Sequence, residues 1–283
     1  MKGSRVIHSL MSSFQIAIAV LSYNHPEITA RAVESALRSS QNPVFLIHNG
    51  SEPKHIEILT QKFPNVKHLI QEKNKGYTGG VNFALKELFR NFEWIFLLTN
   101  DCNLTNFSFD PTQSPAFIAP LIYFRSEKRV DSMGGWFIPE KARIGHYKTE
   151  KEFLSSKQPY IPGTAFFIHR NVFEKVGPFD ESLGTYWEDV DYSMRCLGAL
   201  IPLKLELKTQ IIHGVGKTCH KYSHYTTYLF QRNRKNISRK YTAWYLRPIL
   251  ECFLLANWIR MFLRMLRNKK LDSIQLLWKA ILD

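Results

Sequence analysis

Residues 15–26 read QIAIAVLSYNHP, and this stretch decides the class of fold. Its first eight residues form a short apolar run with β-branched members, which is typical of a strand buried on both faces. The run ends at Tyr-Asn-His-Pro, and Pro is favoured in the first turn of a helix. Apolar residues then recur with helical spacing over residues 27–39. The stretch therefore predicts a buried strand followed directly by a helix.

Similar units follow along the chain. Short apolar runs predict strands at 44–48, 66–70 and 94–99, and helices are expected at about 54–62 and 81–90. Strands that alternate with helices at this spacing indicate an α/β fold, Rossmann-like, with a mostly parallel sheet flanked by helices.

From about residue 115 the pattern changes, because strands are no longer separated by long helices. Strands are expected at 117–124, 130–138, 161–169, 203–206 and 209–213, and helices at 187–200, 220–241, 248–268 and 271–282. The strands predict a mixed sheet region beside the parallel one. We expect a catalytic domain over 1–216, with a nucleotide-binding half at about 15–110 and an acceptor half at about 111–216. Residues 217–283 are expected to be a basic, amphipathic helical extension.

Charge is spread unevenly over the 283 residues. The whole chain carries a net charge of +14, and residues 217–283 alone hold 14 basic against 3 acidic side chains. A 45% hydrophobic fraction excludes a disordered chain. Four cysteines without CxxC spacing indicate a reducing compartment, so we expect a cytoplasmic location.

The sequence shows neither a spanning helix nor a convincing signal peptide. No run reaches 18 uninterrupted apolar residues. Lys2 and Arg5 before the apolar Ile16–Leu21 faintly resemble a signal peptide, but the apolar run is too short, and a buried first strand explains it better.

Polar residues follow each predicted strand of the first half. In an open parallel sheet, ligands bind outside the carboxyl ends of the strands. Each group alone has an ordinary turn composition, but the four together predict a ligand site. They are Tyr23-Asn24, His48-Asn49-Gly50-Ser51, Asn74–Gly80 and Asn100-Asp101.

The glycine-rich segment Asn74–Gly80 opens a predicted helix. Close backbone approach and free N–H groups there would suit a phosphate or a ribose. The segment matches neither GxGxxG nor the P-loop pattern, so a nicotinamide-cofactor site and a P-loop ATPase are disfavoured.

Acidic residues are the candidates for metal binding and for acid–base chemistry. Asp101, at the end of an apolar strand, is well placed to hold a divalent cation, although it would also suit a turn cap. Glu188, Asp189 and Asp191 fall within four residues beside aromatic ones, which exceeds what helix capping needs, and a partly desolvated carboxylate is a credible general base. His213 closes a later strand, where a neutral imidazole would complete a metal site or contact a phosphate.

As a set, these motifs resemble glycosyltransferase family 2, with its GT-A fold, and within it the bacterial rhamnosyltransferase-like branch. The resemblance runs from about Ile16 to the C-terminus. Its carriers, besides the four strand-end groups, are Asn82, Gly163, Gly177–Glu181, Glu188–Asp191, His213-Gly214 and Arg232-Asn233.

The resemblance implies an inverting transfer of a sugar, such as rhamnose, from a nucleotide diphosphate sugar to a glycan or lipid-linked glycan in bacterial surface polysaccharide synthesis. It implies Asp189 as general base, with Glu188 and Asp191 supporting it or contacting the acceptor, and Asp101 and His213 as ligands of Mg²⁺ or Mn²⁺. Trp187, Lys217 and Arg232 would contact acceptor or diphosphate. The nucleotide sugar would lie near Tyr23, Asn24, His48, Asn49, Asn74, Gly76, Gly79, Asn82 and Asn100.

Two departures from the family pattern stand out. His48 occupies the position where the family usually has an acid that contacts the base, and the metal motif keeps only its final acid, Asp101. The nucleobase and the strength of metal binding therefore stay open.

The basic extension has three interpretations: a solvated helix face, cations that hold a diphosphate, or attraction to an anionic membrane surface on the inner face of the cell membrane. In the predicted helix 248–268, Trp258, Phe262 and Met265 lie opposite Arg260 and Arg264. Two rival functions are a non-catalytic sugar-nucleotide-binding protein and a basic nucleic-acid-binding protein. The second lacks any nucleic-acid-binding motif, so no nucleic acid partner is expected.

Overall fold

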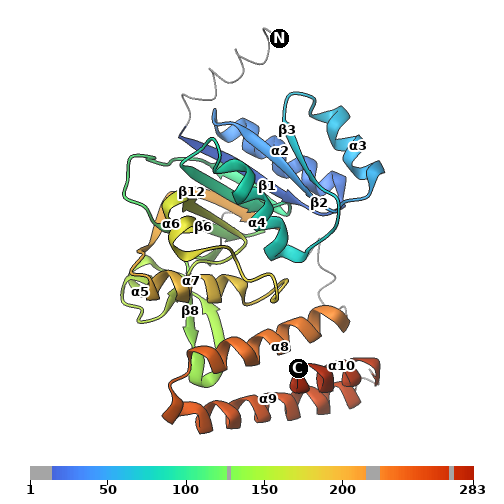
Figure 1. The fold of residues 1–283 in the computed structure, drawn as a ribbon, viewed down its shortest axis with the longest axis vertical. Helices are drawn as coiled ribbons and strands as arrows, with labels where there is room; N and C mark the ends of the chain where they lie inside the picture. The colour runs from blue at the N-terminus through green and yellow to red at the C-terminus, as the bar shows by residue number, and fades with distance from the viewer. Residues whose placement is uncertain (1–14, 126–128, 215–223, 268–270) are drawn as a thin grey trace.

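A computed structural model describes residues 15–125, 129–214, 224–267 and 271–283. Its described residues form a nine-stranded sheet, a smaller three-stranded sheet and a layer of C-terminal helices (Figure 1). In the large sheet, β3 (Lys67–Gln71), β2 (Val44–Asn49), β1 (Ile16–Ser22) and β4 (Trp94–Thr99) lie side by side and parallel. The predicted parallel sheet is thereby confirmed.

Strand β1 is apolar throughout because each face of the sheet carries its own core. Ala17, Ala19 and Leu21 pack with α4 (Gly76–Leu88), whereas the alternate residues Ile18 and Val20 pack under α2 (Pro26–Ser39) and α3 (Pro53–Lys62). Alternation of side chains along a strand requires this division. The helix predicted at 81–90 begins earlier, at Gly76, so part of the glycine-rich segment is helical rather than loop.

The second half of the chain continues the same sheet. Strand β11 (Ala165–His169) lies antiparallel between β4 and β6 (Phe117–Phe124). Strand β12 (Leu203–His213) then pairs in parallel with β6 and antiparallel with β5 (Cys102–Asn106). The sheet is mixed as predicted, but the mixed part joins the parallel part directly.

Several predicted boundaries are corrected here. The strands expected at 203–206 and 209–213 form the single strand β12, whose register shifts between Glu206 and Gln210. The strand expected at 130–138 divides into β7 (Val130–Ser132) and β8 (Gly135–Ile138), and only β7 belongs to the large sheet. Strand β5 was not predicted.

The small sheet stands below the large one in the order β10-β8-β9. It consists of β10 (Pro159–Tyr160), β8 and β9 (Arg143–His146), and the 3₁₀ turn η1 (Pro139–Lys141) joins β8 to β9. The short helix α5 (Glu150–Leu154) lies between β9 and β10 in the chain, whereas α6 (Arg170–Val176) follows β11 and contacts β11 and α7.

The remaining helices follow the predicted order. They are α7 (Glu188–Gly198), α8 (His224–Tyr241), η2 (Trp244–Leu246), α9 (Arg247–Arg267) and α10 (Leu271–Leu282), and the start predicted for α8 at 220 lies outside the described residues. Figure 1 shows α8, α9 and α10 as a layer beneath α7 and β8, with α9 furthest from the large sheet. Among the described helices, none combines the length and apolar character needed to cross a membrane.

Candidate active site

A cavity of about 1050 Å³ opens at the carboxyl ends of β1 and β4. The first turn of α4, the segment before α7, the small sheet and α8 complete its walls. Of the predicted site residues, the cavity is lined by Tyr23, Asn49, Asn74, Gly76, Asp101, Trp187, Glu188, Asp189, His213 and Arg232. Lys217 lies outside the described residues. The cavity thus collects residues from both halves of the sheet and from the C-terminal layer.

The glycine-rich segment borders the cavity, but its N–H groups are already used. Gly76 N–H donates to the Asn74 side chain at 2.8 Å, and Thr78 N–H donates to the Gly184 carbonyl at 3.0 Å. Tyr77 N–H donates to the Thr185 hydroxyl at 3.3 Å. The structure therefore contradicts the expectation of free N–H groups for a phosphate. The start of α4 instead fixes the 184–185 segment, which leads to the acidic residues.

Gly76 is required at this turn for two reasons. Its φ of +72° favours glycine, and a Cβ there would stand 2.9 Å from the Gly184 carbonyl oxygen. Asn49 holds the same turn from β2, since its amide donates to the Gly76 carbonyl at 2.8 Å and its oxygen accepts from Gln71 at 2.7 Å.

Other predicted nucleotide-sugar residues brace turns and do not line the cavity. The Asn24 oxygen accepts the Glu52 N–H at 3.0 Å, and the Asn100 amide donates to Thr29 at 2.9 Å. Asn82 both donates to and accepts from the Phe179 backbone at 2.9 Å. Gly79 lies within α4, where a Cβ would meet Lys75. These four residues do not line the cavity, and their predicted contact with the donor stays a prediction.

His48 also lies outside the cavity. It is fully buried and contacts His68, with 2.9 Å between the ring nitrogens. Burial, together with the neighbouring His68, lowers the pKa of His48 to about 4, so its ring is neutral at physiological pH. A neutral His48 therefore stands where the family usually has a charged acid, and it does not line the cavity.

Asp101 and His213 meet at the cavity wall. His213 Nε2 lies 3.4 Å from an Asp101 carboxylate oxygen, and the Thr99 hydroxyl donates to Asp101 at 2.7 Å. Asp131, from β7, lies on the other side of the ring, 3.6 Å from Nδ1, and it was missed because its strand appeared to be an ordinary one. Burial opposes the charge on His213, but the two carboxylates outweigh it and raise its pKa to about 9.

The donor atoms here suit a hard divalent cation. Ligand atoms of Asp101, Cys102 and His213 lie within 4.8 Å of one another. Burial raises the pKa of the Cys102 thiol well above its usual range, so it stays protonated and is a poor ligand. The remaining carboxylate and imidazole donors fit Mg²⁺ or Mn²⁺ better than a thiophilic metal. A cation would also displace the His213 proton.

Glu188 and Asp189 begin α7 at the cavity, where Glu188 is buried and Asp189 half-buried. Asp189 accepts N–H groups from Gly163 at 3.0 Å and from Val190 at 2.8 Å. One Glu188 oxygen is buried with no hydrogen-bond partner in the described residues. Burial raises the pKa of both acids, and the charge of Asp189 raises that of Glu188 further. Asp189, with its two N–H donors, is therefore the carboxylate that ionises first.

A strained turn aims these acids. Tyr186 and Trp187 both have positive φ, +72° and +70°, which is costly for aromatic residues. The buried amide of Asn233, on α8, holds this turn by donating to the carbonyls of Leu183, Thr185 and Tyr186 at 2.8–3.0 Å. Asn233 was part of the family resemblance but had no predicted role.

Asp191 does not line the cavity, and its hydrogen bonds are to side chains that anchor α7. It is fully buried and accepts from Lys240 at 2.6 Å, from Tyr241 at 2.8 Å and from Arg195 at 2.9 Å. Burial opposes its ionisation, but Lys240 and Arg195 lower its pKa below the usual value. It ties α7 to α8.

Trp187 and Arg232 line the cavity with limited freedom. Trp187 is 2% exposed and packs edge-on against Phe137 and Phe230. Arg232 donates to the Ser182 carbonyl at 2.7 Å. Its predicted contact with acceptor or diphosphate stays a prediction.

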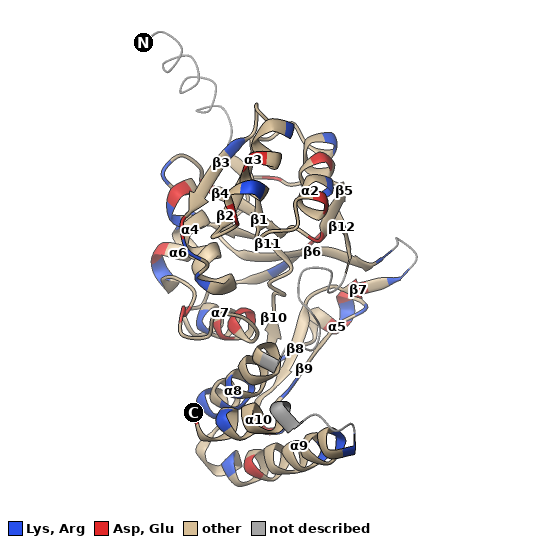
Figure 2. Ribbon diagram, turned by 90° about the vertical axis from the view of Figure 1, so that its right-hand side faces the viewer, with Lys and Arg blue, Asp and Glu red and all other residues tan. Residues whose placement is uncertain are grey.

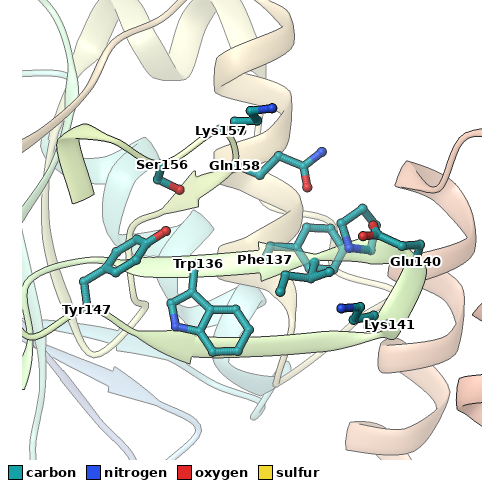
Figure 3. A pocket seen from close by; sticks show the side chains of 10 residues that line it. Trp136, Phe137, Glu140, Lys141, Tyr147, Ser156, Lys157 and Gln158 are labelled. Atoms are coloured by element: carbon teal, nitrogen blue, oxygen red, sulfur yellow. The ribbon is translucent and has the colours of Figure 1, made fainter. Parts of the chain in front are cut away.

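A second hollow of about 610 Å³ lies at the small sheet and contains none of the predicted residues. Figure 3 shows Trp136 and Tyr147 along it, with Glu140 and Lys141 at its end. Of the predicted acids, Asp101, Glu188 and Asp189 line the larger cavity, and none lines this second hollow.

Comparison with known proteins identifies the relatives of this chain. The family described as Glycosyl transferase family 2 matches residues 17–177. A curated protein of Mycobacterium tuberculosis, N-acetylglucosaminyl-diphospho-decaprenol L-rhamnosyltransferase, is 24% identical over 276 residues, covering 83% of this chain and 87% of that protein.

Solved structures share the fold at low identity. The structure of GalNAc-T7 with UDP, GalNAc and Mn²⁺ has a TM-score of 0.58 and 14% identity. The match covers 84% of this chain and 55% of GalNAc-T7, so this chain spans about half the length of GalNAc-T7. The mannosyltransferase PcManGT of Pyrobaculum calidifontis with GDP-Man and Mn²⁺ has a TM-score of 0.54 and 10% identity, covering 96% and 87%.

The match covers more than half of the chain, and the fold agrees with the GT-A type. The chain belongs to glycosyl transferase family 2 and is a glycosyltransferase that moves a sugar from a nucleotide sugar.

Proposed function

We propose that the transfer inverts the anomeric centre and that Asp189 is the general base. The supporting observation is that one cavity contains the Glu188–Asp189 pair, the Asp101–His213 pair and the start of α4. Asp189 takes the proton of the acceptor hydroxyl as its oxygen attacks the anomeric carbon, while the bond to the diphosphate breaks on the opposite face. A single displacement of this kind inverts the centre.

The choice of Asp189 over Glu188 rests on hydrogen bonding. Asp189 has backbone donors to both of its oxygens, which stabilise the ionised form. Glu188 has a buried, unpartnered oxygen and a higher pKa, so it stays protonated beside the ionised Asp189. Burial raises the pKa of the Asp189 carboxyl above its value in water. A pKa nearer to the working pH suits a general base.

Asp101 and His213 would hold Mg²⁺ or Mn²⁺, with Asp131 orienting His213. When bound, the cation neutralises charge on the diphosphate of the donor. Asp101 keeps its carboxylate form over the physiological range, because burial, which raises its pKa, is outweighed by His213 and Thr99.

We further propose a deoxysugar such as rhamnose as donor and a lipid-linked glycan as acceptor, in bacterial surface polysaccharide synthesis. The name of the Mycobacterium tuberculosis relative supports both, since it is a rhamnosyltransferase whose acceptor carries a diphospho-decaprenol. The structures with UDP or GDP-Man differ in nucleobase, and His48 does not line the cavity, so the nucleobase stays open. The cytoplasmic location also stays a prediction.

A binding and turnover screen tests the proposal. The full chain is incubated with dTDP-, UDP- and GDP-sugars, with and without Mn²⁺, and with a polyprenyl diphosphate glycan as acceptor. Product analysis by NMR should show the opposite anomeric configuration from the donor. Retention of configuration would reject inversion, and binding without turnover by the parent would favour the non-catalytic alternative.

A further inference from the structure

The outer face of α9 carries an exposed apolar row that nothing in the described residues covers. Leu255, Ile259, Leu263 and Leu266 are 56%, 50%, 57% and 44% exposed. Their spacings of three and four residues place them on one side of the helix. A contiguous exposed row of large apolar side chains is characteristic of an interaction surface.

The opposite face of α9 is the one that packs on the protein. Leu250 and Leu254 are fully buried, and with Trp258 they contact Ala142, which follows η1. This corrects the expectation that Trp258, Phe262 and Met265 present an apolar face to a membrane. The helix is apolar on both sides, and only one side is covered by the residues that the structure describes.

A row of arginines runs beside the exposed apolar row. The three arginines Arg260, Arg264 and Arg267 come directly after Ile259, Leu263 and Leu266, respectively, and all three are exposed. In the described residues no acid pairs with them, since Glu251, the only acid of α9, is held by Arg239 at 2.7 Å. Figure 2 shows basic positions along α9, which lies at the end of the molecule away from the large sheet.

We infer that this α9 face docks on an anionic lipid surface. Apolar side chains inserted between headgroups, with arginines beside them at headgroup level, are the pattern of an interfacial helix. A second copy of the chain fits less well, because residues 217–283 carry a net charge of +11 and two such surfaces would repel. Trp244 and Tyr245, 80% and 63% exposed directly before α9, add aromatic side chains suited to the interface.

Docking of α9 on a lipid surface does not depend on the proposed reaction. It would add a lipid surface at which a lipid-linked acceptor is held. Helix α8, which lines the cavity, contacts α9 through the same layer. The lipid surface would therefore lie against the same helical layer that supplies one wall of the cavity.

Vesicle flotation of the full chain tests the inference. Vesicles of phosphatidylcholine alone are compared with vesicles that also contain phosphatidylglycerol, at low and high salt. Ile259→Ser should weaken binding to the anionic vesicles about tenfold, since half of its side chain is free to be buried. Arg260→Glu/Arg267→Glu should weaken it about a hundredfold.

Matched controls are available on the other side of the molecule. Ile58→Ser, at a residue that is also 50% exposed, and Arg31→Glu/Arg38→Glu, an exposed pair with the same seven-residue spacing on α2, should leave binding unchanged. Equal losses in controls and variants, or no binding of the parent to anionic vesicles, would overturn the inference. So would a dimer in solution that Ile259→Ser dissociates without any vesicle binding. Donor hydrolysis in solution, unchanged in all five proteins, separates this test from that of the reaction.

Discussion

Replacing Asp189 by Asn removes the carboxylate that we assign as general base while keeping the size of the side chain. A positioned general base contributes about 10²–10⁴-fold to the rate. We therefore expect kcat/KM to fall by that factor, or roughly 3–5 kcal/mol in the barrier. Asn keeps one acceptor oxygen for the Gly163 or Val190 N–H and loses the other, which costs about 1 kcal/mol of stability and should leave donor binding intact.

Glu188→Gln is the matched control. Glu188 stays protonated beside the ionised Asp189, so a neutral amide imitates its working state. We expect kcat/KM to change by less than about tenfold, well below the loss from removing a base.

The pH profile adds an independent readout. Burial raises the pKa of Asp189, and the base acts only as a carboxylate. Activity should therefore fall as the pH drops through that raised pKa, with a midpoint above the ordinary value of about 4. Glu188→Gln should keep this acidic limb.

The assay measures release of the nucleoside diphosphate from pH 4 upward, with nucleotide binding as the check that each variant is folded. Asp189 is not the general base if Asp189→Asn keeps activity to within about tenfold of the parent, or if Glu188→Gln loses activity by about 10²-fold or more.

Three further outcomes are expected. Asp131→Asn should weaken Mn²⁺ binding, measured by titration calorimetry, about 10–100-fold, because Asp131 faces His213 Nδ1; unchanged affinity would remove its orienting role. Glu188→Gln should raise the melting temperature at neutral pH but not at pH 3: a folded pKa above the unfolded one means that wild-type stability falls as pH rises above about 4. Asn233→Ala should lower the unfolding free energy in urea by about 1–3 kcal/mol, since three carbonyls lose a donor, whereas Asn257→Ala, which loses one side-chain bond to Gln231, should cost less.

The positions of the central strands were predictable because a strand buried on both faces is a continuous run of apolar residues. In β1 and β4 nearly every residue is apolar, and the predicted strands match to within a residue. Strand β5 reads CNLTN and lies at the edge, where its pairing with β12 and not its composition makes it a strand. Its position depends on residues about a hundred positions away, which a local pattern does not contain.

The start of α4 shows the same limit. Its glycines indicate a loop when read locally, yet a Cβ at Gly80 would stand 2.9 Å from Asn49 and Leu21. The glycines serve close packing of the helix on the sheet. Only the folded contact distinguishes this from a phosphate-binding loop.

Within the site, carboxylates were easier to predict than amides. Asp101, Glu188 and Asp189 end or begin elements at one edge of the sheet, so topology brings them into the cavity. An Asn at the same edge is equally suited to bracing a turn, and the sequence does not say which way its amide points. Asn82 illustrates this, because the Phe179 backbone uses both ends of its amide.

The boundary predicted at residue 216 separates elements that the structure joins. Helix α8 lies beyond it, yet its Asn233 holds the turn before Glu188, and its Lys240 neutralises the buried Asp191 three residues after Glu188. A buried carboxylate and three carbonyls would lose their partners without α8, at a cost that a marginally stable domain does not easily bear. The same helix supports α9 and its exposed basic face. The charge concentrated in the last quarter of the chain is therefore attached to the helix that shapes the acidic end of the cavity.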